Sequence, residues 1–155
     1  MDLRLQDELK QSRPFATIEQ EATLNVVRTG AMLTDMFEQV LKPYGLSAAQ
    51  YNVLRILRGA EPEGLCRNEI RDRMITRMPD MTRLLDRMEH AGLVTRTRQR
   101  TDRRLVRTEL TERARELLDE IEPRMLEEHR NRLGSMSRED LRRIIELLTA
   151  VRRQW

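Results

Sequence analysis

The apolar pattern of the chain changes from helical to alternating near its middle, and this change constrains the fold most strongly. Over residues 79–91 the apolar side chains recur at helical spacing, and Gly92 marks the end of that helix. Residues 94–99 and 105–110 then alternate in side-chain character, as half-buried strands do. The sequence therefore predicts a helix followed at once by a two-stranded hairpin.

Helical patterns cover most of the remaining chain. Helices are expected to begin at Thr17, Ser47, Arg67, Pro79, Thr111 and Ser137. Thr17 and Ser47 are each followed by a glutamine three residues later, which makes a capping box that bonds unpaired backbone N–H groups. Pro79 suits the first helical position, where its missing N–H would be unpaired anyway. Pro123 is expected to kink or interrupt the helix that contains it.

Three short helices followed by a hairpin make a winged helix-turn-helix, whose third helix enters the major groove of DNA. The expected fold is mainly α with a small β-hairpin, flanked by long N- and C-terminal dimerisation helices. Within one continuous structural domain, residues 1–45 form an N-terminal arm and dimerisation helix, 46–111 the DNA-binding region, and 112–155 the C-terminal dimerisation helices. The first long helix exceeds what a small domain needs, so part of it is expected to pack on another chain.

Basic charge is concentrated in one third of the chain. Between residues 67 and 107 there are twelve arginines and six acidic residues, a balance of +6, whereas the rest holds 17 basic and 20 acidic residues, a balance of −3. Such an asymmetry indicates a polyanion-binding face. A solvated surface in an arginine-biased proteome is the alternative, since only two of the 29 basic residues are lysines.

The helix predicted over 79–91 carries arginine where this geometry needs it. Arg83 and Arg87 lie four residues apart and share one face. Thr82 and Arg83 are the candidates for base-edge contacts. Arg77 and Arg87 are the candidates for phosphate contacts. Pairing of these arginines with nearby acidic residues is the alternative, but exposed ion pairs are typically worth less than about 1 kcal/mol and explain the concentration poorly.

The hairpin carries six further arginines, and like charges packed so densely repel each other unless a polyanion is near. Asp102 is expected to pair with Arg104 and stiffen the turn. Arg100 and Arg103 would then be free at the tip to enter a minor groove, where narrow A·T tracts attract arginine. The DNA-binding candidates together are Arg77, Pro79, Asp80, Thr82, Arg83, Arg87, Arg98, Arg100 and Arg103.

Two segments, LLDRMEHAGLVTR and DRRLVRTELT, lie in the right order and spacing within a stretch from Leu46 to Leu118. This stretch resembles the MarR family of bacterial transcription regulators. The first segment is similar to the family's end of recognition helix and first wing strand. The second is similar to its pattern of Asp, any residue, Arg, and then Leu-Thr at the start of the next helix. The resemblance implies a homodimer that binds a pseudo-palindromic operator, usually represses nearby genes, and is released by small phenolic or lipophilic ligands or by oxidants.

The expected dimer and ligand site each involve particular residues. The dimerisation candidates are Ile18, Leu133, Leu141, Ile144 and Leu148. Met32 and Met36 are the ligand-binding candidates, because a flexible methionine-lined crevice between the first long helix and the winged region would accept varied apolar ligands. Methionines of this kind are more often core filler, which is the alternative.

Other functional classes find no support in the sequence. There is no Gly-rich phosphate loop, nucleophile elbow or paired His-Glu metal motif, and the two histidines stand isolated, so no enzyme, metal site or cofactor is expected. With no run of 18 apolar residues and no signal-peptide stretch, no membrane association is expected and the protein is predicted to be cytoplasmic. The single cysteine, Cys66, is interpreted as a capping or partly buried thiol rather than as a redox sensor.

The sequence thus predicts a sequence-specific transcription regulator that binds double-stranded DNA, and most simply a homodimeric repressor relieved by a small-molecule or stress signal. The rival is a dimeric structural or antirepressor-type protein that no longer binds specific DNA. An RNA-binding module is disfavoured, because such modules usually stack bases on aromatic side chains and the basic segment contains no Phe, Tyr or Trp.

Overall fold

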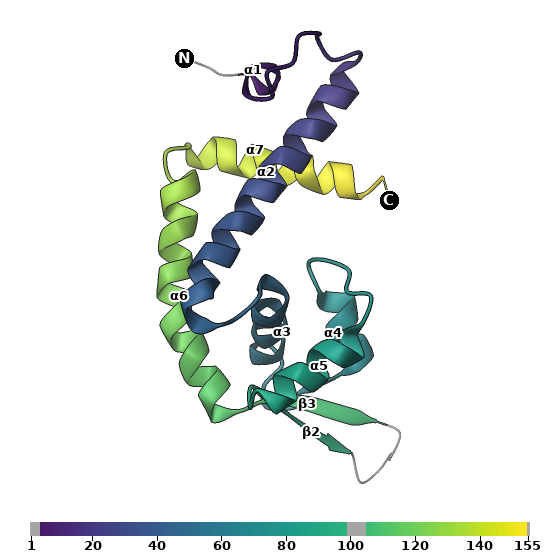
Figure 1. Ribbon diagram of the computed structural model, residues 1–155, viewed down its shortest axis with the longest axis vertical. Helices are drawn as coiled ribbons and strands as arrows, with labels where there is room; N and C mark the ends of the chain where they lie inside the picture. The colour runs from purple at the N-terminus through teal and green to yellow at the C-terminus, as the bar shows by residue number, and fades with distance from the viewer. Residues whose placement is uncertain (1–3, 99–104, 155) are drawn as a thin grey trace.

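Long helices and a small sheet meet in the computed structural model of the chain, which describes residues 4–98 and 105–154 (Figure 1). The helices are α1 (Leu5–Glu8), α2 (Ile18–Leu41), α3 (Ala48–Arg58), α4 (Arg67–Arg73), α5 (Met81–His90), α6 (Glu112–Leu133) and α7 (Arg138–Arg152), with a 3-10 turn, η1, over Lys42–Tyr44. The strands β1 (Leu65–Cys66), β2 (Val94–Arg98) and β3 (Val106–Leu110) form an antiparallel sheet in the order β1-β3-β2. These elements confirm the predicted mainly helical fold with a hairpin wing.

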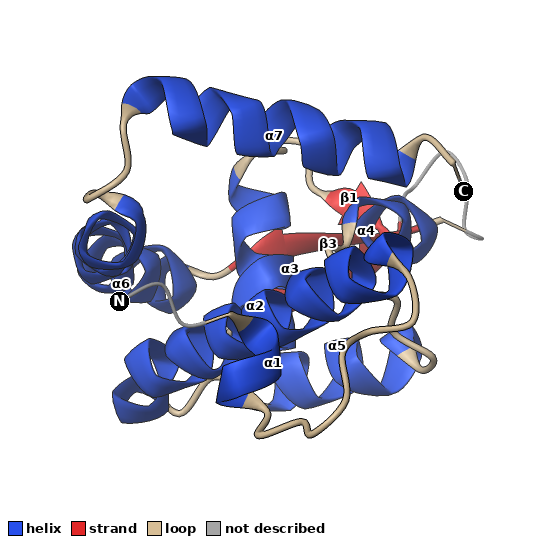
Figure 2. Ribbon diagram, turned by 90° about the horizontal axis from the view of Figure 1, so that it is seen from above, coloured by secondary structure: helices blue, strands red, loops and turns tan. Residues whose placement is uncertain are grey.

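The winged region, made of α3, α4, α5 and the sheet, occupies one end of the molecule (Figure 1). α2 packs against α6 and α3, and α6 also packs against α3. α7 crosses α2 in Figure 1, but the view from above in Figure 2 separates the two helices. No residue of α7 is buried. The last helix therefore lies on the surface of its own chain.

A hydroxyl cap marks the start of α2, and a complete capping box marks the start of α3. Thr17 Oγ1 accepts a hydrogen bond from Gln20 N at 3.2 Å. Ser47 Oγ accepts one from Gln50 N at 3.2 Å, and Gln50 Oε1 in turn accepts one from Ser47 N at 2.9 Å. The Gln20 carboxamide instead accepts from Ala16 N, one residue before the cap. Both helix starts are confirmed.

α5 begins two residues later than predicted. Pro79 precedes the helix, and Asp80 is its N-cap, because Asp80 Oδ1 accepts a hydrogen bond from Arg83 N at 2.9 Å. A carboxylate in this place bonds an N–H that the first turn leaves unpaired, and it also meets the positive end of the helix dipole. The prediction of Pro79 as the first helical residue is therefore wrong.

The predicted interruption at Pro123 does not occur, because α6 continues through it. A proline inside a helix costs about 3 kcal/mol. Ile121 and Met125, on either side of it, are buried together with Leu118. Burial of each such side chain contributes about 1.5–3 kcal/mol, so the packing of α6 outweighs the local cost of the proline.

The core is aliphatic and is shared by the winged region and the long helices. Its fully buried large side chains include Leu41, Leu54, Leu57, Ile70, Leu84, Leu85, Met88, Leu118 and Ile121. They belong to α2, α3, α4, α5 and α6, so these helices pack as one body. β1, which was not predicted, pairs Leu65 with Thr108 of β3. Its two residues are too few to show an alternating pattern.

The Asp80→Ala variant is expected to lower the free energy of unfolding by about 1 kcal/mol, because it removes the cap of α5. Asp80→Asn keeps an oxygen that accepts the same bond, so this control should lose less. Urea unfolding followed by far-UV circular dichroism measures both variants. Equal stability of Asp80→Ala and the wild type would contradict a stabilising role for the cap.

Candidate nucleic-acid interface

α5 turns its apolar side into the core and its polar side to solvent. Thr82, Arg83 and Arg87 are exposed on the polar side. Arg77 is exposed in the turn between α4 and α5. The first turn of a helix also carries free N–H groups, which favour phosphate. The structure thus leaves exposed, on α5 and in the turn before it, the residues predicted to contact base edges and those predicted to contact phosphates.

Ion pairs divide the arginines of residues 67–107 into two groups. Arg71 pairs with Asp72 at 3.0 Å, and Arg107 pairs with Glu69 at 3.2 Å. Within the part of the chain that the structure describes, no ion pair involves Arg67, Arg73, Arg77, Arg83, Arg87 or Arg98. The second group supplies the positive charge that this face offers to a polyanion.

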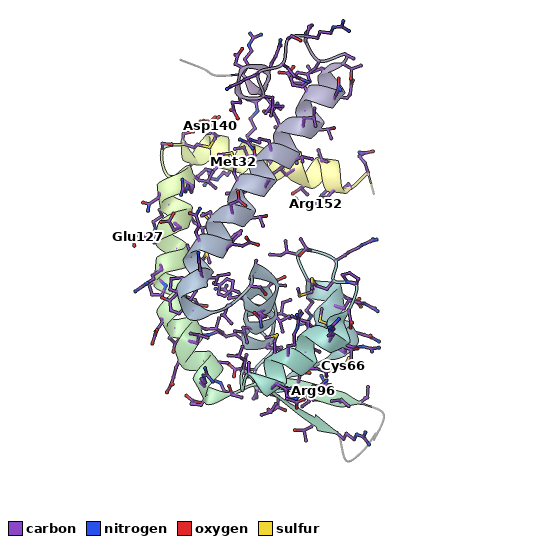
Figure 3. All side chains as sticks on the ribbon, in the orientation of Figure 1. Met32, Cys66, Arg96, Glu127, Asp140 and Arg152 are labelled. Carbon is purple, nitrogen blue, oxygen red and sulfur yellow. The ribbon has the colours of Figure 1, made fainter. Side chains whose placement is uncertain are left out.

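Arg96 belongs to the paired group and joins the hairpin to α5 (Figure 3). Its Nη2 lies 2.6 Å from Asp86 Oδ1 and 2.6 Å from Glu89 Oε2, and its Nε donates to the same Glu89 oxygen at 2.8 Å. The pKa of Arg96 is raised above its ordinary value, chiefly by the hydrogen bond to Glu89. Arg96 therefore pairs with two carboxylates of α5, offsets one of their two negative charges, and fixes β2 against that helix.

Pro79 and Asp80 lie exposed in front of α5. Asp80 already accepts the N-cap hydrogen bond from Arg83 N. A base that bonded to Asp80 would therefore use the same carboxylate that caps α5. Arg98 is exposed at the end of β2, opposite Val106 of β3. The DNA contacts of these residues stay predictions. The hairpin-tip predictions for Arg100, Asp102, Arg103 and Arg104, including the Asp102–Arg104 pair, lie outside the described residues.

Three hydrogen bonds at the start of α4 were not predicted. Arg67 Nη1 donates to Thr82 Oγ1 at 3.1 Å. Glu69 Oε2 accepts from Cys66 N at 2.7 Å and from Arg107 Nη1 at 3.2 Å. The bond from the Cys66 N–H is the main reason that the pKa of Glu69 lies below its ordinary value. The contacts of Arg67 and Arg107 join residues 15 and 38 positions apart, so neither periodicity nor a local motif could indicate them.

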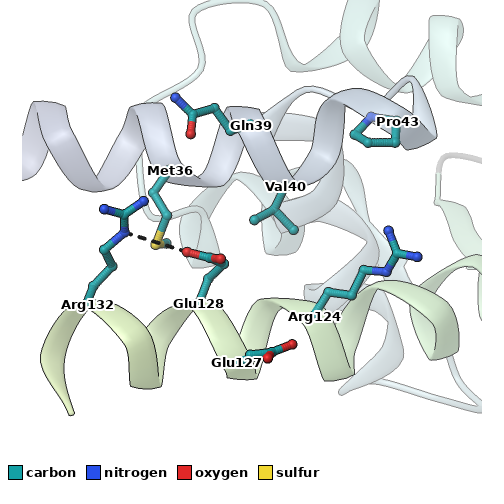
Figure 4. A pocket seen from close by; sticks show the side chains of 8 residues that line it. All are labelled: Met36, Gln39, Val40, Pro43, Arg124, Glu127, Glu128 and Arg132. Atoms are coloured by element: carbon teal, nitrogen blue, oxygen red, sulfur yellow. Dashed lines mark ion pairs between the residues drawn. The ribbon is translucent and has the colours of Figure 1, made fainter.

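The predicted ligand-binding methionines lie along grooves between α2 and α6. Met36 lines a groove of about 390 Å³ whose walls carry charged side chains, among them Arg124 and Glu128 (Figure 4). Met32 and Met36 line a second groove of about 320 Å³. Neither groove lies against the winged region, where the methionine-lined crevice was expected.

A larger cavity, of about 540 Å³, does lie against the winged region. It is enclosed by α2, α3, α6 and the turn between α4 and α5, and its lining includes Phe37, Tyr51, Asn52, Ile75, Leu126 and His129. The rings of Phe37 and His129 meet edge to face, with centroids 5.6 Å apart. Burial raises the pKa of Tyr51. The cavity thus combines apolar walls with a few polar groups, as sites for small organic ligands do.

The predicted dimerisation residues lie on α2, α6 and α7. Ile18, at the start of α2, is 78% exposed. Leu133 and Ile144 are also exposed, and Leu141 and Leu148 are half-buried. Each of these apolar side chains keeps surface that its own chain does not cover.

Among residues 4–98 and 105–154, no three His, Cys, Asp or Glu side chains gather as metal ligands do. No helix in these ranges combines the length and the apolar character that crossing a membrane requires.

The Arg96→Ala variant is expected to weaken DNA binding at least about tenfold, because it leaves Asp86 and Glu89 unpaired beside the DNA and frees β2 from α5. Arg98→Ala is the matched control on the same strand, since it removes an exposed cation without exposing a carboxylate. Arg98→Ala should lose less affinity than Arg96→Ala. The slope of log affinity against log salt concentration should nevertheless fall by about one, the amount expected for one lost phosphate contact. Fluorescence anisotropy on one duplex at several salt concentrations gives both quantities. If Arg96→Ala loses no more DNA affinity than Arg98→Ala does, Arg96 has no role in positioning β2 against α5.

Comparison with known proteins agrees with this geometry. The family model described as "Transcriptional regulator SarA/Rot" matches residues 35–121, more than half of the chain. The HTH-type transcriptional regulator PecS of Dickeya dadantii (strain 3937) is 28% identical over 145 residues, which are 92% of this chain and 87% of PecS. A MarR transcription factor from Planctomyces limnophilus is 37% identical, with a TM-score of 0.67 over 88% of this chain and 99% of its own.

The fold also matches CouR, a transcriptional repressor. Its structure bound to a 23-mer DNA duplex is 23% identical, with a TM-score of 0.77 over 91% of this chain and 99% of CouR. CouR from Rhodococcus jostii RHA1 bound to p-coumaroyl-CoA has a TM-score of 0.75 at 23% identity, over 88% of this chain and 95% of its own. At this identity the likeness concerns the fold. Taken with the family match and the arginine-bearing face of α5, it leads to one identification: the chain belongs to the SarA/Rot family and is a DNA-binding transcription regulator of the MarR type.

Proposed function

We propose that the chain acts as a homodimeric repressor, which binds a pseudo-palindromic operator and leaves it when a small ligand or a stress signal arrives. The observation that carries this proposal is the apolar surface that α2 and α7 leave uncovered. Because its target is DNA, we place the protein in the cytoplasm.

The uncovered apolar surface holds more side chains than the scattered single apolar residues that protein surfaces normally expose. Its exposed members are Ile18, Val26, Val27, Met32, Leu133, Ile144, Ile145, Leu147 and Val151. A helix of 15 residues such as α7 gains most of its stability by packing an apolar stripe, yet no residue of α7 is buried in its own chain. Large contiguous patches of this kind mark interfaces. A second copy of the chain is the occupant we infer, because one surface paired with itself closes a two-fold dimer.

A two-fold dimer places two copies of α5 on one side of the assembly. Two recognition helices read a pseudo-palindromic site when their separation matches successive major grooves, roughly 34 Å apart. The arginines without ion pairs within the described residues then contact phosphates in both half-sites. A modest change in the separation weakens both sets of contacts together, which makes such a dimer a switch.

The cavity of about 540 Å³ is the ligand site we infer for that switch. Its volume and its lining of Phe37, Tyr51 and Leu126 suit a small apolar or phenolic molecule. The half-buried Tyr51 hydroxyl, whose pKa is raised by burial, is a hydrogen-bond partner for a phenol. The groove in Figure 4 suits such a ligand less, because four of its eight lining residues are charged, against two of twelve, Arg55 and Glu122, in the larger cavity.

A hydrogen bond connects this cavity to the DNA-binding face. Asn52 Oδ1, in the cavity lining, accepts from Ile75 N at 2.9 Å and so holds the turn between α4 and α5. The Ile75 side chain is 85% exposed although it also lines the cavity. Arg77 follows two residues later. A ligand that contacts Ile75 only when this side chain turns into the cavity binds that position of the turn better than the exposed position. Such a difference in affinity is the condition for shifting a two-state equilibrium.

The structural or antirepressor-type alternative keeps the dimer and loses specific DNA binding. It predicts uniformly weak affinity for every duplex and no effect of Arg83→Ala on preference. The arginines of α5, which have no ion pair within the described residues, favour the repressor instead.

The Ile144→Glu variant is expected to be monomeric and to lose at least about tenfold in affinity for a full operator, because a buried charge disrupts the paired face. Ala150→Glu is the matched control, since it adds the same charge at an exposed residue about a third of a turn around α7 from Ile144 and outside the apolar set named above. Light scattering measures the mass, and fluorescence anisotropy on duplexes that tile the gene's upstream region measures binding. A dimeric Ile144→Glu, or a wild-type monomer that binds as tightly, would rule out the proposed dimer.

The Leu126→Trp variant is expected to fill the large cavity and abolish binding of the dye 1-anilino-8-naphthalenesulfonate, whose fluorescence rises in apolar sites. Gln39→Trp places the same side chain in the groove of Figure 4 and should leave binding unchanged. Fluorescence titration compares both with the wild type, and p-coumarate serves as a competing phenol. Loss of dye binding in Gln39→Trp but not in Leu126→Trp would move the site to the other groove.

A further inference from the structure

We infer that Arg67 of α4 and Thr82 of α5 read one base pair as a unit, in which Arg67 fixes the direction in which the Thr82 hydroxyl donates its proton. The inference rests on the proposed position of α5 in the major groove. It assigns a role in specificity to a residue outside the recognition helix.

The contact is made at the exposed starts of two helices. Arg67 is the first residue of α4, Thr82 stands in the first turn of α5, and Arg67 Nη1 donates to Thr82 Oγ1 at 3.1 Å. The other contact of the guanidinium, from Nη2 to Asn68 Oδ1, is 3.5 Å long and correspondingly weak. No carboxylate within the described residues forms an ion pair with Arg67. Its remaining N–H groups are therefore available to DNA.

The bond from Arg67 makes the Thr82 hydroxyl a better donor than acceptor. A hydroxyl has one proton and two lone pairs, and Arg67 occupies one lone pair. The guanidinium charge also draws electron density from the oxygen, so the second lone pair accepts more weakly and the proton donates more strongly. Thr34 and Thr149 donate their protons to carbonyl oxygens four residues earlier in their helices, at 2.9 and 2.7 Å. Thr82 makes no such bond to any described residue, and the residue four positions before it, Met78, lies ahead of the helix. Its proton is thus free for a partner in the groove.

A hydroxyl that donates more readily than it accepts selects among bases. In the major groove, guanine, adenine and thymine each present an acceptor, whereas cytosine presents only its N4 amino donor. A donating Thr82 therefore disfavours cytosine at the position it contacts. When Arg67 is absent, no cation weakens the lone pairs of the hydroxyl, and the same hydroxyl accepts more readily from cytosine N4. Arg67 would thus set base preference without touching the base itself.

The test compares base preference in single and double variants. The wild-type protein first selects its preferred site from a library of randomised duplexes. Anisotropy at fixed salt then measures the affinity of each variant for duplexes that carry one replaced base pair. Arg67→Ala and Thr82→Val are each expected to lower the discrimination against cytosine about tenfold at the same position, a loss typical of one good base contact. The double variant should lose no more than either single one.

Arg73→Ala is the matched control, because Arg73 lies on the same helix and also has no ion pair within the described residues. It should leave that discrimination unchanged. If Arg67→Ala weakens all duplexes equally and lowers the salt slope by about one, Arg67 contacts only phosphate and the inference is overturned. Additive losses, or losses at two different positions, overturn it as well. A wild type that selects no sequence would refute the operator-binding function itself, which separates that failure from the failure of this inference.

Discussion

The rest of the structure depends on the burial of one side of α5 in the core that this helix shares with α3 and α6. Leu84, Leu85 and Met88 of α5 lie in the same core as Leu118 and Ile121 of α6. With these aliphatic residues turned inward, the helical repeat leaves the polar residues of α5 on the opposite side. The same contacts join the winged region to the long helices, so a displacement of α6 reaches the recognition helix through side chains packed at high density.

Acidic residues decide which arginines this face offers to DNA. Asp86 and Glu89 of α5 hold Arg96 at 2.6 Å each, and Glu69 holds Arg107. These pairs attach the sheet to α4 and α5, and they also remove negative charge that would oppose a phosphate backbone. The exposed arginines of α5 remain without such partners in the described residues. The +6 balance of residues 67–107 therefore lies mainly on exposed arginines rather than on the paired ones.

The cavity, the turn between α4 and α5, and the uncovered surface of α7 give the proposed regulator its three parts. The cavity lies where α2 and α6 meet the winged region, and Asn52 connects it to the turn that leads to Arg77. The apolar surface of α7 follows the C-terminal end of α6 in the chain. Ligand, DNA and a second copy would therefore each contact α6 or an element packed with or joined to it. Through these shared contacts, binding of one partner can change the affinity for another.

The sequence by itself determined the elements whose signals are local. Caps at Thr17 and Ser47, the end of α5 at Gly92 and the alternation of the hairpin depend on residues a few positions apart, and the helix order and fold class follow from them. Only the tertiary structure decided the continuity of α6 through Pro123, the third strand β1, the cavity in place of a methionine crevice, and the bonds of Arg96 and Arg67. Each of these depends on contacts between segments distant in sequence, where the free energy of packing or ion pairing outweighs local preference. Local periodicity and residue spacing do not predict contacts between segments that are far apart in the sequence.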